Sequence, residues 1–150
     1  MRVHIVKKMK NLINFFLLSL IFAGYCSAQA GSNFTIEFNN VVINGGTVYV
    51  AIFASAESFR RETPEYYFDF APAQNTVACA YSLPSGEYVI SAYQDANNNG
   101  KMDFGLFRIP RELVGISNYF GRGFPSQNFD RQKVAVNSNT DKVIINLYKF

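Results

Sequence analysis

The sequence has no tryptophan, one histidine and two cysteines among its 150 residues. His4 lies in an N-terminal segment that we expect to be removed, so the mature chain would contain no histidine. Ser-His-Asp catalysis, Cys-His catalysis and histidine-ligated metals are then excluded. Cys26 lies in the same segment, which leaves Cys79 without an intrachain partner and excludes a disulfide framework. We expect Cys79 to be a packed core thiol, because no basic neighbour in the sequence would lower its pKa.

The N-terminal segment has the three regions of a secretory signal peptide. Three lysines within residues 7–10 precede an apolar run at 12–25, and small residues follow at 26–30. The run is short for a membrane-spanning helix, which needs about 20 apolar residues. We therefore expect residues 1–28 to be a signal peptide, cut after Ala28 or Ala30, and residues 31–150 to form a single domain.

Removal of this segment changes the net charge of the chain. Four of the 14 Lys and Arg residues leave, so ten remain against 11 Asp and Glu, a net charge of about −1. A basic surface for nucleic acid is therefore not expected. No second long apolar run follows, so the mature chain should have no transmembrane span. Lipidation of Cys26 is an alternative fate, although bulky Tyr25 stands where a small residue normally precedes a lipidated cysteine.

The mature chain alternates apolar and polar residues with the period of β-strands. The expected strands are 33–43, 47–54, 66–70, 76–83, 87–94, 129–136 and 142–149, with one helical turn at 56–62. An Asn-Gly-Gly turn at 44–46 predicts that the first two strands form a hairpin, and the last two strands are expected to pair around 137–140. About seven short strands with turn signals between them predict an all-β, antiparallel sandwich.

One segment, 95–128, has little alternation over 34 residues. A loop of this length in a compact domain is usually functional or disordered. Its many Phe and Tyr residues argue against disorder, so we expect one long ordered loop that covers an end or a face of the sandwich.

The beginning of this segment, DANNNGKMD, has the spacing of a calcium-binding loop. Oxygen-bearing side chains occupy loop positions 1, 3, 5 and 9, a glycine occupies position 6, and position 7 requires only a main-chain carbonyl. The last ligand position holds Leu106 instead of a glutamate, and the nearest later carboxylate is Glu112. The candidate calcium ligands are Asp95, Asn97, Asn99, Lys101, Asp103 and Glu112. A metal-free Asn/Gly-rich turn is the alternative.

Two further groups of residues suggest function. Asp95, Asp103 and Glu112 carry the carboxylates that glycoside hydrolysis would require, although such chemistry needs a raised pKa in a cleft. The sequence NYFGRGFP places aromatic side chains around an arginine, which is suited to stacking on a sugar or gripping a partner. Its candidate binding residues are Tyr119, Phe120, Arg122 and Phe124. The alternative is that Phe120 and Phe124 fix the long loop to the core.

Several short motifs in one order resemble a bacterial family known as domain of unknown function 2141. They are VYVAIFAS, LPSGEYVISAYQDANNNGKMD, IPRELVGISN and GRGFPSQNFDRQKVAV. The matching positions are Leu83, Pro84, Gly86, Tyr88, Asp95, Asn97, Asn99, Gly100, Asp103, Ile109, Pro110, Glu112, Gly115, Ser117, Asn118 and Phe129. Arg108 replaces the usual glycine before Ile-Pro, and Leu113-Val114 stands where an aromatic is common. The resemblance implies a secreted or periplasmic sandwich of immunoglobulin-like or transthyretin-like type, and it implies no activity.

These observations together predict a non-catalytic, calcium-stabilised module of the bacterial cell envelope, located in the periplasm, at the outer membrane or outside the cell. Its expected partner is an envelope protein or a glycan. A carbohydrate-binding module or a carboxylate-based glycoside hydrolase is the first alternative, and an accessory subunit of an outer-membrane complex is the second. Because a strand leads into the loop and no helical periodicity flanks it, calcium would act as a fixed support and not as a sensor's switch.

Overall fold

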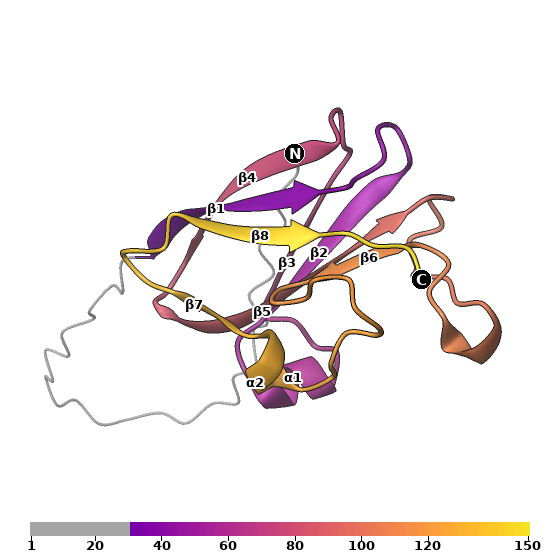
Figure 1. Cartoon of the computed structure of the whole chain (residues 1–150). Helices are drawn as coiled ribbons and strands as arrows, with labels where there is room; N and C mark the ends of the chain where they lie inside the picture. The colour runs from indigo at the N-terminus through magenta and orange to yellow at the C-terminus, as the bar shows by residue number, and fades with distance from the viewer. Residues whose placement is uncertain (1–30) are drawn as a thin grey trace, which may run out of the picture.

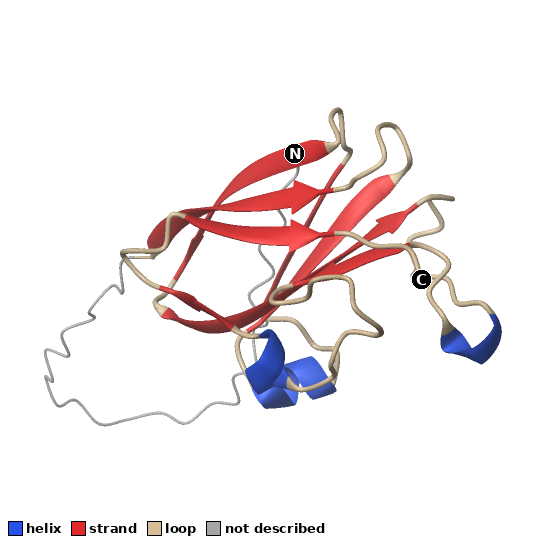
Figure 2. Cartoon of the chain, viewed as in Figure 1, coloured by secondary structure: helices blue, strands red, loops and turns tan. Residues whose placement is uncertain are grey.

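The computed structural model describes residues 31–150, which form two β-sheets packed face to face (Figures 1 and 2). The expected signal peptide and its cleavage site lie outside the described residues. No helix within residues 31–150 is both long and apolar enough to cross a bilayer. The expected all-β sandwich is confirmed.

The smaller sheet has three strands in the order β4, β1, β8. β1 (Ser32–Asn39) lies in the middle, with β4 (Thr76–Leu83) antiparallel on one side and β8 (Lys142–Asn146) parallel on the other. The β1–β8 pair is the one departure from the expected antiparallel pairing in this sheet.

The larger sheet has the order β3, β2, β5, β6, with β7 paired to the start of β5. Its strands are β3 (Tyr66–Phe70), β2 (Thr47–Phe53), β5 (Gly86–Asp95), β6 (Leu113–Ile116) and β7 (Val134–Val136). All of these pairs are antiparallel. β5 therefore has the most neighbours in this sheet, because it pairs with β2, β6 and β7.

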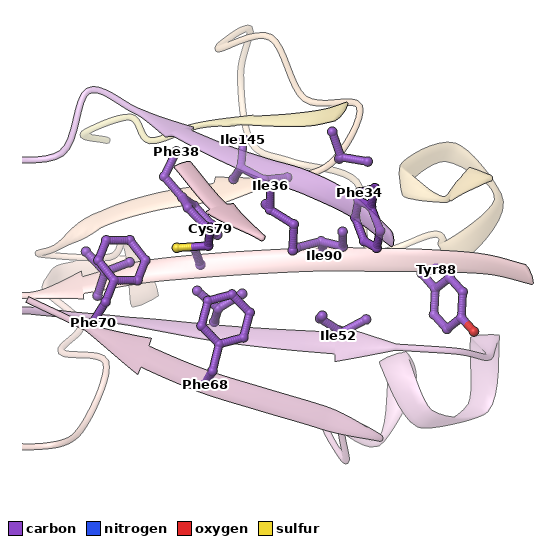
Figure 3. Close-up of a cluster of buried hydrophobic side chains, with 14 of the residues drawn as sticks. Phe34, Ile36, Phe38, Ile52, Phe68, Phe70, Cys79, Tyr88, Ile90 and Ile145 are labelled. Carbon is purple, nitrogen blue, oxygen red and sulfur yellow. The ribbon is translucent and has the colours of Figure 1, made fainter. Parts of the chain in front are cut away.

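The core lies between the sheets and is built from the inward-facing residue of each alternating pair (Figure 3). Phe38 of β1 contacts Phe68 and Phe70 of β3, with ring centroids 6.2 and 5.2 Å apart. Burial of each such side chain contributes about 1.5–3 kcal/mol. Cys79 is buried in the same cluster, so the prediction of a core thiol is confirmed, and burial raises the pKa of its thiol above the ordinary value.

The expected hairpin of the first two strands is wrong. β1 belongs to the smaller sheet and β2 to the larger one, and the connection 40–46 carries the chain across the core. Val41 is buried on this crossing, and its amide donates to the carbonyl of Asn75. A tight hairpin needs a loop of two to five residues, whereas this connection is longer and is anchored by its own apolar residue.

The expected pairing of the last two strands is also wrong. β7 pairs with β5 and β8 pairs with β1, so the turn at 137–140 again joins the two sheets. Residues Phe129–Gln132 form the short helix α2 instead of a strand. The cause is local, because the side chain of Asn128 accepts a hydrogen bond from the amide of Arg131 and caps the helix.

The long segment is ordered, as expected, but it contains the strand β6 and the short 3₁₀ helix η1 (Leu106–Arg108). β6 escapes the sequence pattern because it has four residues, one of which is Gly115. A side chain there would meet the carbonyl oxygen of Asn146 at 2.7 Å, so glycine allows β6 to approach β8 closely. The expected helical turn near 56–62 is confirmed as α1 (Ala56–Arg60), which begins with a capping box between Ser55 and Ser58.

Candidate functional site

The outer face of the larger sheet is apolar as well as its inner face. The outward residues Phe53, Val89 and Ile116 come from β2, β5 and β6, and together with Tyr119 they form a second buried cluster. The helices α1 and α2, which lie side by side in Figure 1, cover one end of this face through Phe59 and Phe129. The segment that ends at Phe150 also packs against the cluster. This sheet is therefore sandwiched on both sides for part of its length.

The part that remains open forms a groove of about 710 Å³. Its floor is the strand surface around Ala51, Ser91, Tyr93 and Val114. One wall comes from the loop 96–112, through Met102, Phe104, Arg108 and Pro110. The opposite wall comes from the segment 118–128 and the C-terminal region, through Phe124, Pro125, Gln127 and Phe150, and α1 with the residues after it closes one end. Pockets of this size commonly hold small molecules in proteins.

The loop that supplies the first wall is closed by the carboxylate of Asp95. Asp95 is fully buried at the end of β5. Its Oδ2 accepts from the amide of Gly100 at 2.7 Å, and its Oδ1 accepts from the amide of Asn99 at 3.2 Å. Gly100 has φ of +75°, which glycine adopts without strain. The first predicted ligand therefore organises the turn itself.

Three other predicted ligands converge within this loop. The Oδ2 atom of Asp103 accepts from the side-chain amide of Asn97 at 2.6 Å and from that of Asn99 at 3.0 Å. The Oδ1 atoms of the two asparagines accept from the amides two residues later, Asn99 and Lys101. These local bonds are the usual reason that asparagine favours turns.

Glu112 is a buried residue that reaches back into the same loop from the start of β6. Its Oε1 accepts from the amide of Ala96 at 3.3 Å, and its Oε2 accepts from the amide of Asp103 at 3.1 Å. Burial raises the pKa of Glu112, the amide of Asp103 lowers it, and the carboxylate of Asp95 raises it further. The β5–β6 register explains the meeting, because Gln94 lies opposite Leu113 and brings the residues just beyond them together. All six candidate calcium ligands thus lie in one loop or against it.

The donor chemistry of this loop fits a hard cation. The carboxylates of Asp95, Asp103 and Glu112 all accept hydrogen bonds from residues of this loop, and none of them takes part in the ion pairs found within residues 31–150. No three His, Cys, Asp or Glu side chains in the described part of the chain are arranged to hold a metal by themselves. Calcium would therefore need the asparagine oxygens and a main-chain carbonyl as well, which is the mixed oxygen set that calcium takes. A rotated amide of Asn97 or Asn99 would turn its oxygen toward Asp103.

Two residues that support the loop were not predicted from the sequence. The side chain of Asn98 accepts from the amide of Thr47 at 3.2 Å and ties the loop to β2. Gly46 has φ of +94°, and a Cβ atom there would lie 1.8 Å from the carbonyl oxygen of Asp95. The Asn-Gly-Gly turn signal was visible, but its closeness to the loop depends on the pairing of β2 with β5.

The predicted aromatic site divides into two parts. Tyr119 is buried, with its ring against Tyr148 and its hydroxyl donating to the carbonyl of Gly123. Phe120 and Phe124 are 76% and 65% exposed, so the alternative that these two fix the loop to the core is wrong. Phe124 stacks on Phe150 at 5.3 Å and lines the groove, whereas Phe120 and Arg122 are exposed outside the groove lining.

The floor residue Tyr93 was not predicted as part of a site. Its ring stacks on Tyr49 of the neighbouring strand with centroids 5.3 Å apart. Burial, followed by the nearby Tyr49, Asp95 and Glu112, raises the pKa of Tyr93 to about 12. The sequence did carry a signal for an apolar outer face of this sheet. The neighbouring strand β2, VYVAIF, is apolar or aromatic at nearly every position and so has no polar face.

Other motif residues have structural roles. The hydroxyl of Tyr88 donates to the carbonyl of Pro84 at 2.9 Å and holds the turn before β5. The buried Ser117 accepts from the amide of Ile90 and donates to the carbonyl of Gln132, which connects β5 to α2. The neighbouring Asn118 donates to the carbonyl of Lys133.

Comparison with known proteins gives one match. A family described as an uncharacterized protein conserved in bacteria, DUF2141, matches residues 36–144. This range includes the candidate calcium loop, all of β2 to β7, and parts of β1 and β8. No curated protein and no solved structure matches the chain.

Proposed function

The chain belongs to the bacterial family DUF2141, and we propose that it is an exported, non-catalytic binding module of the cell envelope. In this proposal the groove on the outer face of the larger sheet is the binding surface, and calcium holds one of its walls. The observation that carries the proposal is that a single loop, 96–112, contains candidate calcium ligands and also supplies the groove residues Met102, Phe104 and Arg108.

Export is proposed from the sequence of the N-terminal segment. Its lysines, apolar run and small residues have the order of a secretory signal. Millimolar calcium outside the cytoplasm suits a site with an affinity of about 10⁻⁴ to 10⁻³ M, the range of extracellular modules. That weak range is expected because the loop lacks the usual twelfth-position glutamate.

The role of calcium is mechanical in this proposal. Loop 96–112 is held by hydrogen bonds that its amides donate to the carboxylates of Asp95, Asp103 and Glu112, and these carboxylates repel one another when ionised. A divalent cation would cancel the repulsion and reduce the freedom of the groove wall.

Binding is favoured over hydrolysis by the placement of the carboxylates. Asp95 and Glu112 are buried beneath the loop and are not part of the groove lining. Glu62 is the one carboxylate among the described residues that line the groove. A glycosidase needs two carboxyl groups on opposite sides of the scissile bond, so this surface supports recognition better than chemistry.

The calcium part of the proposal is tested by thermal unfolding with 10 mM calcium or with chelator. Calcium should stabilise the fold by about 1.4–2.7 kcal/mol at 10 to 100 times its dissociation constant, which raises the melting temperature by roughly 4–10 °C. Asp103→Asn keeps the side-chain shape but removes the charge, and it should abolish most of this rise. The matched control is Asp141→Asn, which changes an exposed carboxylate far from the loop. Equal melting temperatures of the natural protein with calcium and with chelator would exclude a calcium site of this strength.

The binding part is tested by filling the groove. Ser91→Phe places a ring on the floor without touching the inner core, since Ser91 faces outward on β5. Any specific ligand should lose affinity for this variant. If every ligand class that binds the natural protein binds Ser91→Phe equally well, the groove is not the binding surface.

Carbohydrate binding is the second candidate. The observation in its favour is the near-parallel stack of Phe124 on Phe150, with 13° between the rings, beside the exposed Phe120. A glycan array compared between the natural protein and Phe124→Ala tests it. Glycan signals that vanish in the variant favour sugar as the ligand. Stable co-purification with one larger envelope protein would instead favour the accessory-subunit alternative.

A further inference from the structure

The groove has the chemistry of an apolar ligand site. Aromatic, aliphatic and proline side chains make up most of its lining, and the polar groups are few and separated. Ser91 and Tyr93 lie on the floor, whereas Glu62, Arg108 and Gln127 belong to the walls and ends. A sugar would need many hydrogen-bonding partners close together, whereas a hydrocarbon chain gains from every apolar contact.

The two segments that form the walls also carry exposed apolar side chains. Leu106 and Phe107, at the tip of the first wall, are 77% and 85% exposed. On the opposite wall, Phe120 and Phe124 are also exposed. Single exposed apolar residues are ordinary, but a set on both sides of one groove marks an interaction site.

The exposed charges of the two wall segments, 96–112 and 118–128, are basic, whereas the exposed Glu62 lines the end of the groove beside α1. The basic residues of the two walls are Lys101, Arg108, Arg111 and Arg122, and none of them takes part in the ion pairs found within residues 31–150. The carboxylates of the same region are occupied, since Asp103 is hydrogen-bonded by two asparagines and Glu112 is buried. The exposed charge of these two walls is therefore positive, and Glu62 is the one negative charge of the groove lining.

Arg108 is the basic residue that lies in the groove wall. Its guanidinium carbon lies 6.0 Å from the centroid of the Phe104 ring, which also lines the groove. Phe107 and Arg108 both have positive φ, at 59° and 58°, a backbone conformation that residues other than glycine rarely adopt. A cation held at the edge of an apolar groove can pair with an anionic group while the rest of that ligand lies among apolar side chains.

From these contacts we infer that the groove binds a single-chain amphiphile with an anionic head group, the class to which fatty acids belong. The hydrocarbon chain lies over Ser91, Tyr93 and Val114 between the two walls, and the head group pairs with Arg108. This inference rests on the proposed role of the groove as a binding surface and adds the ligand class.

The test compares three amphiphiles with the same twelve-carbon chain: dodecanoate, dodecanol and dodecyltrimethylammonium. Isothermal titration calorimetry is carried out on the protein purified in its processed form, with each compound below its micelle concentration. Dodecanoate should bind at least tenfold more tightly than the cationic compound, with the alcohol between them. Arg108→Glu should weaken dodecanoate about tenfold and remove its advantage over the cationic compound.

Two variants keep the result interpretable. Arg131→Glu makes the same change of charge on α2, at an exposed position outside the groove, and should leave the dodecanoate affinity unchanged. Ser91→Phe should weaken all three compounds, because it occupies the space of the chain. An unchanged melting temperature for each variant shows that the fold is intact.

Several outcomes would overturn the inference. Failure of dodecanoate to bind, or equal binding of all three compounds that Ser91→Phe does not affect, excludes an anionic amphiphile in the groove. Sedimentation with phosphatidylglycerol vesicles but no binding of monomeric dodecanoate would mean that the exposed rim docks on a membrane. If glycans bind in a manner sensitive to Ser91→Phe while dodecanoate does not, the binding module stands and the ligand class is wrong. A missing calcium effect would disprove the metal alone.

Discussion

The two sheets have different outer faces. The outer face of the smaller sheet is polar, with Lys142 paired to Glu37 at 3.0 Å and Asn39 bonded to Asn146 at 3.1 Å. The outer face of the larger sheet is apolar, with the stacked Tyr49 and Tyr93 in its middle and the second buried cluster beside them. Both sheets contribute an apolar inner face to the core between them, so the core does not explain this difference.

The two outer faces differ in what must lie against them. A polar outer face is complete when it meets water, whereas an apolar one must be covered by the chain or by a ligand. The chain covers part of the larger sheet with α1, α2 and the C-terminal region, and it leaves the groove over another part. The packing of the described residues therefore leaves this apolar surface uncovered, and the stability of the fold does not account for it.

The largest expected effect contrasts one residue on each outer face. Phe53→Ala removes a buried ring of the second cluster and should lower the free energy of unfolding by about 3–5 kcal/mol. Ile144→Ala, on the outer face of β8, should lower it by less than about 1 kcal/mol, because that side chain is 46% exposed. Urea denaturation measures both. Similar losses for the two variants would mean that the outer cluster is not a second core.

A smaller effect is expected where the connection 40–46 between the sheets contacts the candidate calcium loop. Gly46→Ala combines a positive φ with a clash against the Asp95 carbonyl, and it should cost about 3 kcal/mol. The matched control is Gly100→Ala, which also has a positive φ but has open space around the added methyl group, so about 1 kcal/mol is expected. The difference between their unfolding midpoints measures the closeness of the crossing to the loop. Equal midpoints would contradict this contact.

The smallest effect appears only at alkaline pH, on the apolar outer face itself. The pKa of Tyr93 is raised from 10 to about 12, so its neutral form is favoured by the folded state. The stability linked to it is fully present below pH 10 and is lost as the pH rises through 12. Absorbance of tyrosinate at high pH should show a late step that is missing in Tyr93→Phe. A titration curve that is unchanged in this variant would contradict the raised pKa.

Sequence patterns were sufficient for the class of fold but not for its pairings. Phe34, Ile36 and Phe38 alternate with polar residues in β1, which predicts a strand with one buried face. Which strand lies beside it depends on where the connection 40–46 leads, and the turn signal there is compatible with a hairpin or a crossing. The strand β6 was hidden because four residues that include a glycine carry too little pattern.

The candidate site was predictable where its residues are close in sequence. Asp95, Asn97, Asn99 and Asp103 follow one spacing, and Glu112 was expected as the later carboxylate that lies against them. The groove was not predictable, because its lining comes from three strands, two loops, the α1 region and Phe150. The fate of each aromatic in 119–124 also depends on the fold, since Tyr119 is buried by Tyr148, a residue from the far end of the chain.

The place of β1 in the smaller sheet has a consequence for the time at which the fold can form. β1 is the first described strand, yet it lies in the middle of its sheet and needs β8, whose residues are about 107 positions later in the chain. Until β8 has been synthesised, one edge of β1 has no neighbour, and contacts between such distant residues form slowly. The smaller sheet of a nascent chain is therefore incomplete until β8 has been synthesised. Such a delay would favour the export proposed above, because a chain that is not yet folded can pass through a narrow translocation pore.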